Sequence, residues 1–542
     1  MTKNLFVYEA SSGGNKVDRL IVDCGIGFPE EEMYGVDLLL PDINYLKGKE
    51  DSIKGIILTH GHDDHIGGLP YILPKLGRKV PIYASPLTAG FAEDTLKDFG
   101  IKDKVDLLKD NQPLSLGSFT FETVAVTHSV PDTKHLIIRT PEGIIYHGSD
   151  FKFDWTPVDG KRPDLQKIAE IGRKGVLCLL SDCLRVEKPG YTLSEKSIAD
   201  GLERELRIAK GKFIMTTMSS NIHRIQQMID PAVAHGRRIA FVGRSFEENV
   251  RTAERLEFIK LPAKAMVNKR QIHKLPDNQQ CLIVGGCQGQ TNSTLVRISR
   301  NEHSLVRIKP GDRVVFAADP IPGNERAVYK TIDDLAKLGA NVSYTDINDD
   351  LHVSGHASAG ELRLLLALVK PKFVVPIGGT FRHMNYYSEM AVDMGWEKNK
   401  IFLLGDGQPL ELSDSSQARV GEKMSLKTVI VDGLGVGDVG KAILSERKKM
   451  AKAGMVVIAI PINGKTNIVS GNPEIITRGF VFVRSARELI REAEKVVVAT
   501  VPQGSRITDW QETREKVSSR LTQFFFDQIQ RQPLILPVRV RT

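Results

Sequence analysis

The stretch LTHGHDDHIGG, residues 58–68, places three histidines and two aspartates within six positions of a chain that has only 13 histidines. A surface loop could carry such a run by chance, but the flanking residues favour a built site. SIKGIIL, residues 52–58, is a short β-branched apolar run of the kind that forms a buried strand. IGGLPYIL, residues 66–73, has the glycines of a turn and then an apolar stretch suited to a helix. The stretch is therefore predicted to be a strand-to-helix loop that presents metal ligands.

The spacing within this loop indicates two metal positions. His60 and His62 are two residues apart, so their rings can point the same way in an extended loop. Asp64 and His65 follow where the chain turns and could reach a second point. Neutral imidazole and carboxylate are the ligands expected of zinc or manganese. Two metals that share a hydrolytic water typically lie about 3.5–4 Å apart.

Composition places the chain among ordinary globular proteins. With 542 residues, 41% of them hydrophobic and 26% charged, it has ample material for several domains. No apolar run approaches the ~18 residues of a membrane span, and the amino terminus lacks a signal-peptide layout, so we expect no membrane association and a cytoplasmic location. The five cysteines form no CxxC pair and are expected to be buried in a reducing compartment. A net charge of +8 fits a polyanion partner without proving one, because 74 basic residues face 66 acidic ones.

Alternating β-rich and helical stretches predict an α/β protein of several domains. Residues 1–185 carry short strands that end in polar residues, which is how an α/β sheet gathers a site at one edge. Residues 186–350 continue as a second α/β unit, and 351–415 return as a loop, a helix and a strand. The polar, aperiodic stretch 416–428 is predicted to be a linker. Residues 429–542 form a third α/β unit that includes the runs MVVIAIPI and GFVFVRS.

Three further side chains of the right types stand at predicted strand ends. Asp23 in RLIVDCG could orient a ligand histidine through a hydrogen bond. AVTHSVPD offers His128, and YHGSDFKFD offers Asp150. Each of these residues alone is more often structural than catalytic. Together with residues 58–68 they make one pattern.

That pattern resembles a known family. The order Asp23, HGHDDH, His128, Asp150 is similar to that of the metallo-β-lactamase fold, and an α/β insert followed by SGHAS at 354–358 resembles the β-CASP nucleases. HSVPD, GSDFKFD, SSNIHR, PIPGNE, HVSGHAS, VDGLGVGDVG, EIITRGFVFVR and LILPV resemble bacterial ribonuclease J over essentially the whole chain. The resemblance implies a metallo-β-lactamase αββα sandwich with an inserted β-CASP α/β domain and a small C-terminal α/β domain.

The same resemblance implies an activity and partners. It implies a zinc-dependent RNA phosphodiesterase with 5′–3′ exonuclease and endonuclease activity on single-stranded RNA, with a preference for a 5′-monophosphate in exonuclease mode. Its implied place is RNA decay and maturation, rRNA processing included. The implied assembly is a homodimer or homotetramer, or a pair with a paralogue. Two Zn²⁺ sites are implied, and Mn²⁺ or Mg²⁺ could replace zinc.

Residue roles are also carried over by motif. The metal ligands would be His60, His62 and His128 for one ion, Asp64 and His65 for the second, and Asp150 as the bridge between them. His356 of SGHAS would lie beside the scissile phosphate and act in catalysis together with Asp64 and Asp150. The residues implied to contact RNA are Ser220, Asn221, His223, Arg224, Ser354, His356 and Ser358.

Two features depart from the family pattern. The family opens with a strand and a GGxGExG loop ahead of the Lys3–Asn4 position, where this chain starts, so an edge strand is expected to be missing. The family's PVHGE stretch appears here as PIGGTFRH, so Gly378 stands where a histidine completes the second metal site and Thr380 replaces the acid. A Gly378→His change is expected to raise metal occupancy and turnover, provided the glycine does not adopt a positive φ.

The missing histidine leaves alternatives open. The leading hypothesis is an active ribonuclease. The second is a catalytically weakened relative that binds RNA or serves as a structural partner subunit. The third, a small-molecule metallohydrolase, is disfavoured by the insert and by SGHAS.

Overall fold

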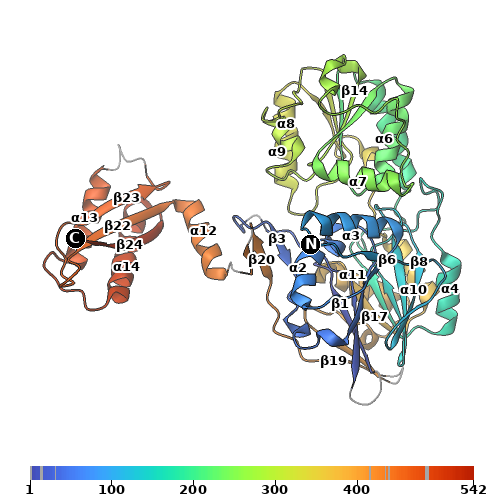
Figure 1. Cartoon of the computed structure of the whole chain (residues 1–542), viewed down its shortest axis with the longest axis horizontal. Coiled ribbons are helices and arrows are strands. Elements are labelled where there is room, and N and C mark those ends of the chain that lie inside the picture. Colours follow the sequence, from blue (N-terminus) through green and yellow to red (C-terminus); the bar gives the residue numbers. More distant parts are fainter. Residues whose placement is uncertain are drawn as a thin grey trace. The chain divides into compact units, whose positions relative to one another are not determined.

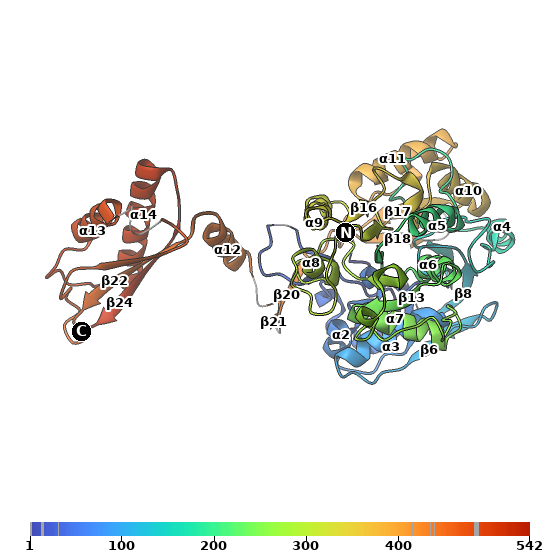
Figure 2. The same cartoon turned by 90° about the horizontal axis from the view of Figure 1, so that it is seen from above.

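Two compact units make up the chain. The computed structural model describes residues 3–11, 16–30, 32–413, 417–433, 435–437, 440–481 and 487–542. The first unit comprises Met1–Phe28 and Leu39–Val429, and the second comprises Pro29–Leu38 and Ile430–Thr542. Figures 1 and 2 show their elements in two perpendicular views.

The first unit begins with a mixed sheet in the order β1-β2-β4-β5-β6. Strands β1 and β2 are antiparallel, and the remaining neighbours are parallel. In β4 every residue except Lys54 is buried, which is why this strand appears in the sequence as a nearly continuous apolar run. The elements are β1 (Phe6–Ser11), β2 (Val17–Val22), β3 (Leu38–Leu40), β4 (Ile53–Leu58), α1 (Asp63–Ile66), α2 (Leu69–Ile72), β5 (Ile82–Ala84), α3 (Pro86–Asp98) and β6 (Val105–Leu107).

A second sheet of the same unit has the order β17-β11-β10-β9-β8-β7. A long stretch of chain separates strand β17 from β11, yet the two strands pair in parallel. The elements are β7 (Leu114–Leu116), β8 (Phe119–Ala125), β9 (Lys134–Thr140), β10 (Gly143–Gly148), α4 (Leu165–Lys174), β11 (Cys178–Asp182), α10 (Ala359–Val369), β17 (Phe373–Ile377) and α11 (Phe381–Asp393).

Apolar side chains join these elements into a helix–sheet–sheet–helix sandwich. Between the sheets, Leu20 of β2 belongs to the same buried cluster as Phe119 of β8 and Leu136 of β9. On the outer face of the second sheet, helices α4, α10 and α11 pack over the strands, with Leu362 and Tyr387 both fully buried there. The fold class expected from the sequence is therefore present in this part of the chain.

The third sheet of this unit is an insert between β11 and α10. Its strands run parallel in the order β13-β14-β12-β15-β16. Both faces are covered: Met215 packs in one core with α5, α6 and α7, and its neighbour Ile214 packs in another with α8 and α9. The elements are α5 (Ala199–Arg207), β12 (Phe213–Thr216), α6 (Ile222–Ala234), β13 (Arg238–Val242), α7 (Arg244–Arg255), β14 (Gln280–Val284), α8 (Thr294–Ser299), β15 (Arg313–Phe316), α9 (Glu325–Lys337) and β16 (Asn341–Ser343).

The second unit contains a sheet in the order β23-β22-β24. In β22 buried and half-buried residues alternate, and the buried ones pack against α13 and α14. The run GFVFVRS, expected in this unit, extends into residues 482–486, which lie outside the described residues. The elements are β20 (Val429–Asp432), β21 (Gly435–Val436), α12 (Lys441–Ala453), β22 (Met455–Ile462), β23 (Glu474–Arg478), α13 (Arg487–Thr500), α14 (Trp510–Ile529) and β24 (Leu534–Arg541).

Part of the expected linker at 416–428 forms a strand, and residues 421–428 lie in no helix or strand. Strand β19 (Gln417–Val420) pairs antiparallel with β18 (Leu410–Ser413), and Arg419 and Glu411 form an ion pair of 2.7 Å across the hairpin. Neither strand buries a residue fully, so the apolar alternation that marks a strand is too weak to see in the sequence.

Two other expectations concern cysteines and membranes. All five cysteines are buried and unpaired, as the sequence predicted. No helix within the described residues has the length and apolar character needed to cross a membrane.

Candidate metal centre

The loop after β4 carries the histidines, and two glycines let it pack tightly. His62 immediately precedes α1, with extended φ/ψ of −82° and 149°. A Cβ at Gly25 would stand 1.6 Å from the Asp64 carbonyl oxygen, and one at Gly61 would stand 2.7 Å from the Phe91 ring. The strand-to-helix loop predicted from residues 58–68 thus packs closely against the segment after β2 at Gly25 and against α3 at Gly61.

Three histidines and one aspartate form the first donor set. His62 Nδ1 lies 3.1 Å from His60 Nε2 and 3.2 Å from His128 Nε2. Asp150 Oδ2 lies 3.8 Å from His60 Nε2 and 3.9 Å from His128 Nε2. The four donor atoms lie within 4.8 Å of one another, so this set could hold one metal ion.

A second donor set shares Asp150 with the first. His65 Nε2 lies 3.5 Å from Asp150 Oδ2 and 3.8 Å from Asp64 Oδ2. Among the described residues, three side chains contribute to this set. The structure therefore brings together the six residues that the sequence proposed as ligands, grouped around one shared carboxylate.

Hydrogen bonds on the far side of each ring determine which nitrogen can bind a metal. His128 Nδ1 lies 2.7 Å from the Gly355 carbonyl oxygen, which can only accept, so Nδ1 must be the protonated nitrogen. His65 Nδ1 lies 2.7 Å from Asp23 Oδ2 and is likewise the donor. The Thr59 hydroxyl donates its proton to Asp23 Oδ2. Thr59 Oγ1 can therefore accept a hydrogen bond from His60 Nδ1, which lies 3.1 Å away. His60 and His128 thus present Nε2, with its lone pair, to the centre, whereas His65 Nε2 lies 2.9 Å from the Asn4 side-chain amide nitrogen.

Asp23 adopts an unusual backbone conformation. Its φ of +61° lies in the left-handed region, which non-glycine residues rarely occupy. Such strain persists where surrounding contacts hold it, commonly at functional sites. Asp23 is fully buried and accepts hydrogen bonds from Thr59 and His65, so its position serves the centre.

Burial and neighbouring charges shift the pKa values in opposite directions. Burial lowers the pKa of His62 to about 3, and it holds the pKa of His60 and His128 well below the usual range. These rings are therefore neutral, the form that ligates metals. Burial also acts on His65, but the carboxylates of Asp23, Asp64 and Asp150 outweigh it and raise its pKa well above the usual value.

A third group at the centre contains a residue that the sequence did not single out. Asp182 ends β11 and accepts from His356 Nδ1 at 2.8 Å, while His356 Nε2 lies 3.9 Å from Asp150 Oδ2. Asp182 follows LCLLS at the carboxyl end of a strand, which was the signal that could have found it. His356 is thereby fixed beside the shared carboxylate.

Gly378 lies beside the carboxylates of Asp182 and Asp150. Its φ is +77°, and a Cβ there would lie 3.4 Å from Asp182 Oδ1 and 3.9 Å from Asp150 Oδ1. The expected gain from Gly378→His required that this glycine not adopt a positive φ. That requirement is not met, because an L-residue at this φ is strained. His383 does not substitute for the missing ligand; its Nδ1 accepts from the backbone N–H of Thr380 at the start of α11.

The residues expected to contact RNA have varied surroundings. Asn221 accepts from the Arg224 N–H at the start of α6. The Arg224 guanidinium is buried and donates to both carboxylate oxygens of Glu195 at 2.8 Å. Ser358 is buried and caps α10. These contacts explain structural roles for the three residues, and their contact with RNA stays a prediction.

Besides His356, described above, three more of these residues remain, of which Ser220 and His223 are buried. Ser354 Oγ accepts from the His356 N–H at 3.1 Å. His223 Nε2 lies 3.5 Å from Asp159 Oδ2. Ser220 is 9% exposed. No RNA contact is tested for these residues either.

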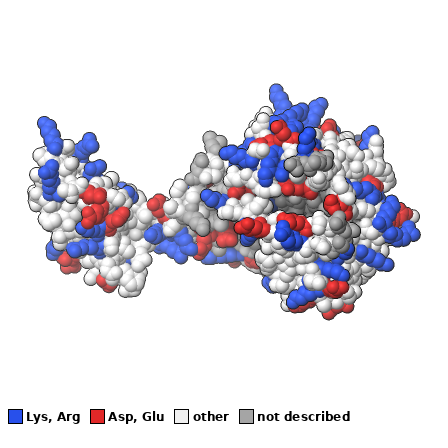
Figure 3. All heavy atoms as spheres, turned by 90° about the horizontal axis from the view of Figure 1, so that it is seen from below, with Lys and Arg blue, Asp and Glu red and all other residues white. Residues whose placement is uncertain are grey.

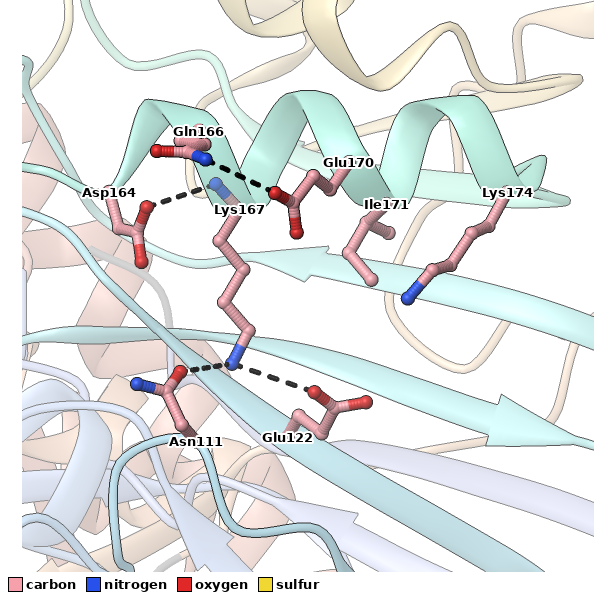
Figure 4. Close-up of a pocket in the computed structure, with 8 residues that line it drawn as sticks. All are labelled: Asn111, Glu122, Asp164, Gln166, Lys167, Glu170, Ile171 and Lys174. Atoms are coloured by element: carbon pink, nitrogen blue, oxygen red, sulfur yellow. Dashed lines mark hydrogen bonds and ion pairs between the residues drawn. The ribbon is translucent and has the colours of Figure 1, made fainter.

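A polar pocket of about 300 Å³ lies apart from the histidines, between α4 and β8 (Figure 4). Lys167 crosses it and its ammonium contacts Asn111 Oδ1 at 3.0 Å and Glu122 Oε2 at 3.5 Å. None of its lining residues belongs to the three donor sets. Its central cation is already paired, so the metal centre remains the candidate functional site.

Comparison with known proteins identifies the family. Four domain descriptions match: the metallo-beta-lactamase superfamily at residues 10–151, the ribonuclease J beta-CASP domain at 210–335, the Zn-dependent metallo-hydrolase RNA specificity domain at 340–400 and the ribonuclease J C-terminal domain at 442–542. Ribonuclease J2 of Bacillus subtilis (strain 168) is 37% identical over 544 residues, which cover 99% of this chain and 96% of that protein. The chain belongs to the ribonuclease J family.

Other ribonuclease J proteins agree. Ribonuclease J of Thermus thermophilus is 39% identical over 96% of this chain and 90% of its own length, and ribonuclease J 1 of Streptococcus pyogenes is 34% identical over 96% and 92%. A crystal structure of a protein of unknown function from Enterococcus faecalis V583 has a TM-score of 0.52 at 16% identity, covers 77% of this chain and 97% of that chain, and supports the fold alone. Membership of the ribonuclease J family confirms the expected resemblance and fold class, and it supports a metal-dependent ribonuclease.

Proposed function

We propose that this chain hydrolyses phosphodiester bonds of single-stranded RNA by 5′–3′ exonuclease and endonuclease action. The observation that carries the proposal is the convergence of three donor sets on Asp150, within a chain of the ribonuclease J family. The RNA substrate, the two modes of cleavage and a place in RNA decay and maturation follow from the family.

The donor types fit divalent metal ions, zinc first. The first set offers three neutral imidazoles and a carboxylate, and the second offers one imidazole and two carboxylates. Two bound ions would lower the pKa of a water between them and screen the charge of a phosphate. Mn²⁺ or Mg²⁺ would suit the oxygen-rich second set better than the first.

The chain's own residues supply orientation around that chemistry. The Thr59 hydroxyl and the Gly355 carbonyl hold the rings of His60 and His128 with Nε2 inward. Asp23 orients the His65 ring, whose Nε2 would exchange its contact with Asn4 for a metal ion. Asp182 holds His356 by Nδ1, which leaves Nε2 facing the shared carboxylate. That position suits hydrogen bonding to a phosphate oxygen or to the leaving oxygen.

A second candidate function is that of a catalytically weakened ribonuclease J that binds RNA or partners an active paralogue. Gly378 favours it, because the second donor set then has three members and no side chain at 378 to complete it. An ion held by few protein groups is lost more readily and acidifies its water less. Assembly as a homodimer, a homotetramer or a mixed oligomer with a paralogue is part of this proposal.

The test is to compare Asp150→Asn with the unmodified protein. Metal per chain is measured by elemental analysis, and hydrolysis is followed on 5′-monophosphorylated and 5′-triphosphorylated single-stranded RNA with added Zn²⁺ or Mn²⁺. Because Asp150 belongs to all three sets, we expect the variant to lose both metal and cleavage while keeping its circular dichroism spectrum. Asp51→Asn, at a fully exposed carboxylate, is the matched control.

The outcomes separate the two candidates. Two tightly held metals with ready turnover would support the active enzyme and exclude the weakened one. About one metal, RNA binding and slow turnover that rises with added metal would support the weakened relative. Normal cleavage by Asp150→Asn would contradict both.

A further inference from the structure

Arg185 lies near the metal centre in the chain but belongs to none of the three donor sets. It comes three residues after Asp182, on the segment that leaves the sandwich for the insert. This segment runs along the returning one: Arg185 forms a parallel bridge with Ser358, and the Ala359 N–H donates to the Lys188 carbonyl at 2.9 Å. Arg185 is therefore next in space to the SGHAS segment that carries His356.

The guanidinium of Arg185 has unused hydrogen-bonding capacity. Its Nε is buried and makes no hydrogen bond, and no hydrogen bond or ion pair joins its side chain to any other described residue. The side chain is only half-buried, and its two terminal nitrogens are not among the buried unbonded atoms, so they reach solvent. Buried donors in native proteins are nearly always paired, and an exception calls for an explanation.

Arg224, which also acts on His352, is an example of an arginine with a structural role. Its guanidinium donates to Glu195 in a bidentate pair and also to the Ala317 and Val353 carbonyls. Every edge of that group meets a protein acceptor. Arg185 has no such partners, so packing alone does not account for it.

Two carboxylates act electrostatically on Arg185 without pairing with it. They belong to Asp319 and Glu361, and neither forms an ion pair with Arg185. Glu361 already accepts three backbone N–H groups, from Phe153, Thr192 and Ser358. The Asp319 side chain is 50% exposed and screened by water.

The charge of Arg185 contributes to the pKa of a neighbouring side chain, His352. Burial first, and then the charges of Arg224, Lys152 and Arg185, hold the pKa of His352 well below its usual value. Lys152 follows β10 of the sandwich, whereas Arg224 belongs to α6 of the insert. Arg185 thus lies near His352, where these two domains of the first unit meet, and unlike Arg224 it has no paired carboxylate.

We propose that Arg185 binds a non-bridging oxygen of the RNA phosphate adjacent to the one that reacts. A planar guanidinium matches the geometry of phosphate oxygens, and its partly desolvated fork strengthens each charge-assisted hydrogen bond. Arg185 comes three residues after Asp182 and lies beside the segment of His356, and the proposal places the neighbouring phosphate of the bound RNA there. This inference rests on the proposed function and names a binding residue for it.

The test measures RNA binding without turnover. A fluorescein-labelled, 5′-monophosphorylated oligoribonucleotide is titrated with full-length protein in EDTA at several salt concentrations. Removing one phosphate contact by Arg185→Ala should weaken binding on the order of ten-fold and reduce the slope of log K against log salt by about 0.7. Arg185→Lys keeps the charge but not the fork, so it should retain most of the slope at an intermediate affinity.

Arg173→Ala is the matched control for loss of one positive charge. Arg173 is exposed at the end of α4, next to Gly172, which packs against Leu368 at the end of α10 far from Ser358. It should bind RNA as the unmodified protein does. In the metal-loaded enzyme, Arg185→Ala should raise KM more than it lowers kcat, because the contact is made equally in ground and transition states.

Three outcomes are informative. Equal affinity and salt slope for Arg185→Ala and Arg173→Ala would overturn the inference and leave the proposed function standing. RNA binding absent from the unmodified protein would fail the proposed function and the inference together. Loss of affinity confined to Arg185→Ala, with the melting temperature unchanged, supports the inference.

Discussion

Replacing Gly378 by histidine should not rebuild the second metal site. The backbone at Gly378 has a φ of +77°, and an L-residue pays about 1–2 kcal/mol to adopt the left-handed region. The new Cβ itself would make only an ordinary contact with Asp182 Oδ1, at 3.4 Å, so backbone strain beside the residue that holds His356 carries the effect. We therefore expect Gly378→His to lower stability and turnover together.

Alanine variants separate backbone strain from crowding. Gly100 has a similar φ of +73° with nothing within 4 Å of an added Cβ, so Gly100→Ala measures the strain alone. We expect about 1–2 kcal/mol of lost stability for Gly100→Ala and a similar loss for Gly378→Ala, whose Cβ would meet only ordinary contacts. Gly378→Asn should be the least harmful side chain at 378, because asparagine tolerates the left-handed region best among non-glycine residues.

The assay combines thermal unfolding with metal analysis. Melting temperature is recorded in EDTA and in excess zinc, and bound metal per chain is measured after gel filtration. In EDTA, Gly378→His should melt lower than Gly100→Ala, and its metal content should not exceed that of the unmodified protein. A Gly378→His protein that melts normally and holds an additional metal ion would refute this reasoning, since it would mean that the loop relaxes to accept the ring.

Two further predictions concern stability. Glu195→Gln leaves the buried Arg224 cation without its bidentate partner and should cost about 3–5 kcal/mol, whereas Glu203→Gln, 59% exposed, should change little; equal urea denaturation midpoints for the two variants would contradict this. Asp18 is buried against solvent but accepts from Lys54 and from Ser118, and these hydrogen bonds outweigh burial and lower its pKa below the ordinary 3.8. Its stabilisation is therefore present above pH 3.8 and is lost as pH falls through the lower folded-state pKa. Asp18→Asn should cost about 1–2 kcal/mol at pH 7, and a deficit that persists undiminished at pH 3 would show that the charge is not responsible.

Local patterns predicted the centre well because its ligands cluster in sequence or end strands. His60 and His65 lie in one loop whose flanks reveal a strand and a helix, and Asp150 follows an apolar run. The structure brings these residues together. Asp182 had the same strand-end signal but no histidine motif around it, so it was passed over.

Other features depend on geometry that no sequence pattern encodes. The φ of Gly378 is set by how β17 meets α11 and decides whether a histidine can stand there. Arg224 belongs to a polar motif that suggested RNA contact, yet its partners Glu195, Ala317 and Val353 are far apart in the chain. The hairpin at 410–420 is hard to predict because its strands are short and only half-buried on one face.

The pairing of β11 with β17 has a consequence for how the protein folds. These neighbours are separated by the whole insert, and joining the ends of so long a flexible segment is entropically unfavourable and slow. The bridge between Arg185 and Ser358 shows that the insert leaves and returns at one point. Once the insert has folded, its ends are already adjacent, and the effective loop between β11 and β17 becomes short. We therefore expect the insert to acquire structure before the sheet around it closes, so that mutations in its core would slow formation of the metal centre without touching a single ligand.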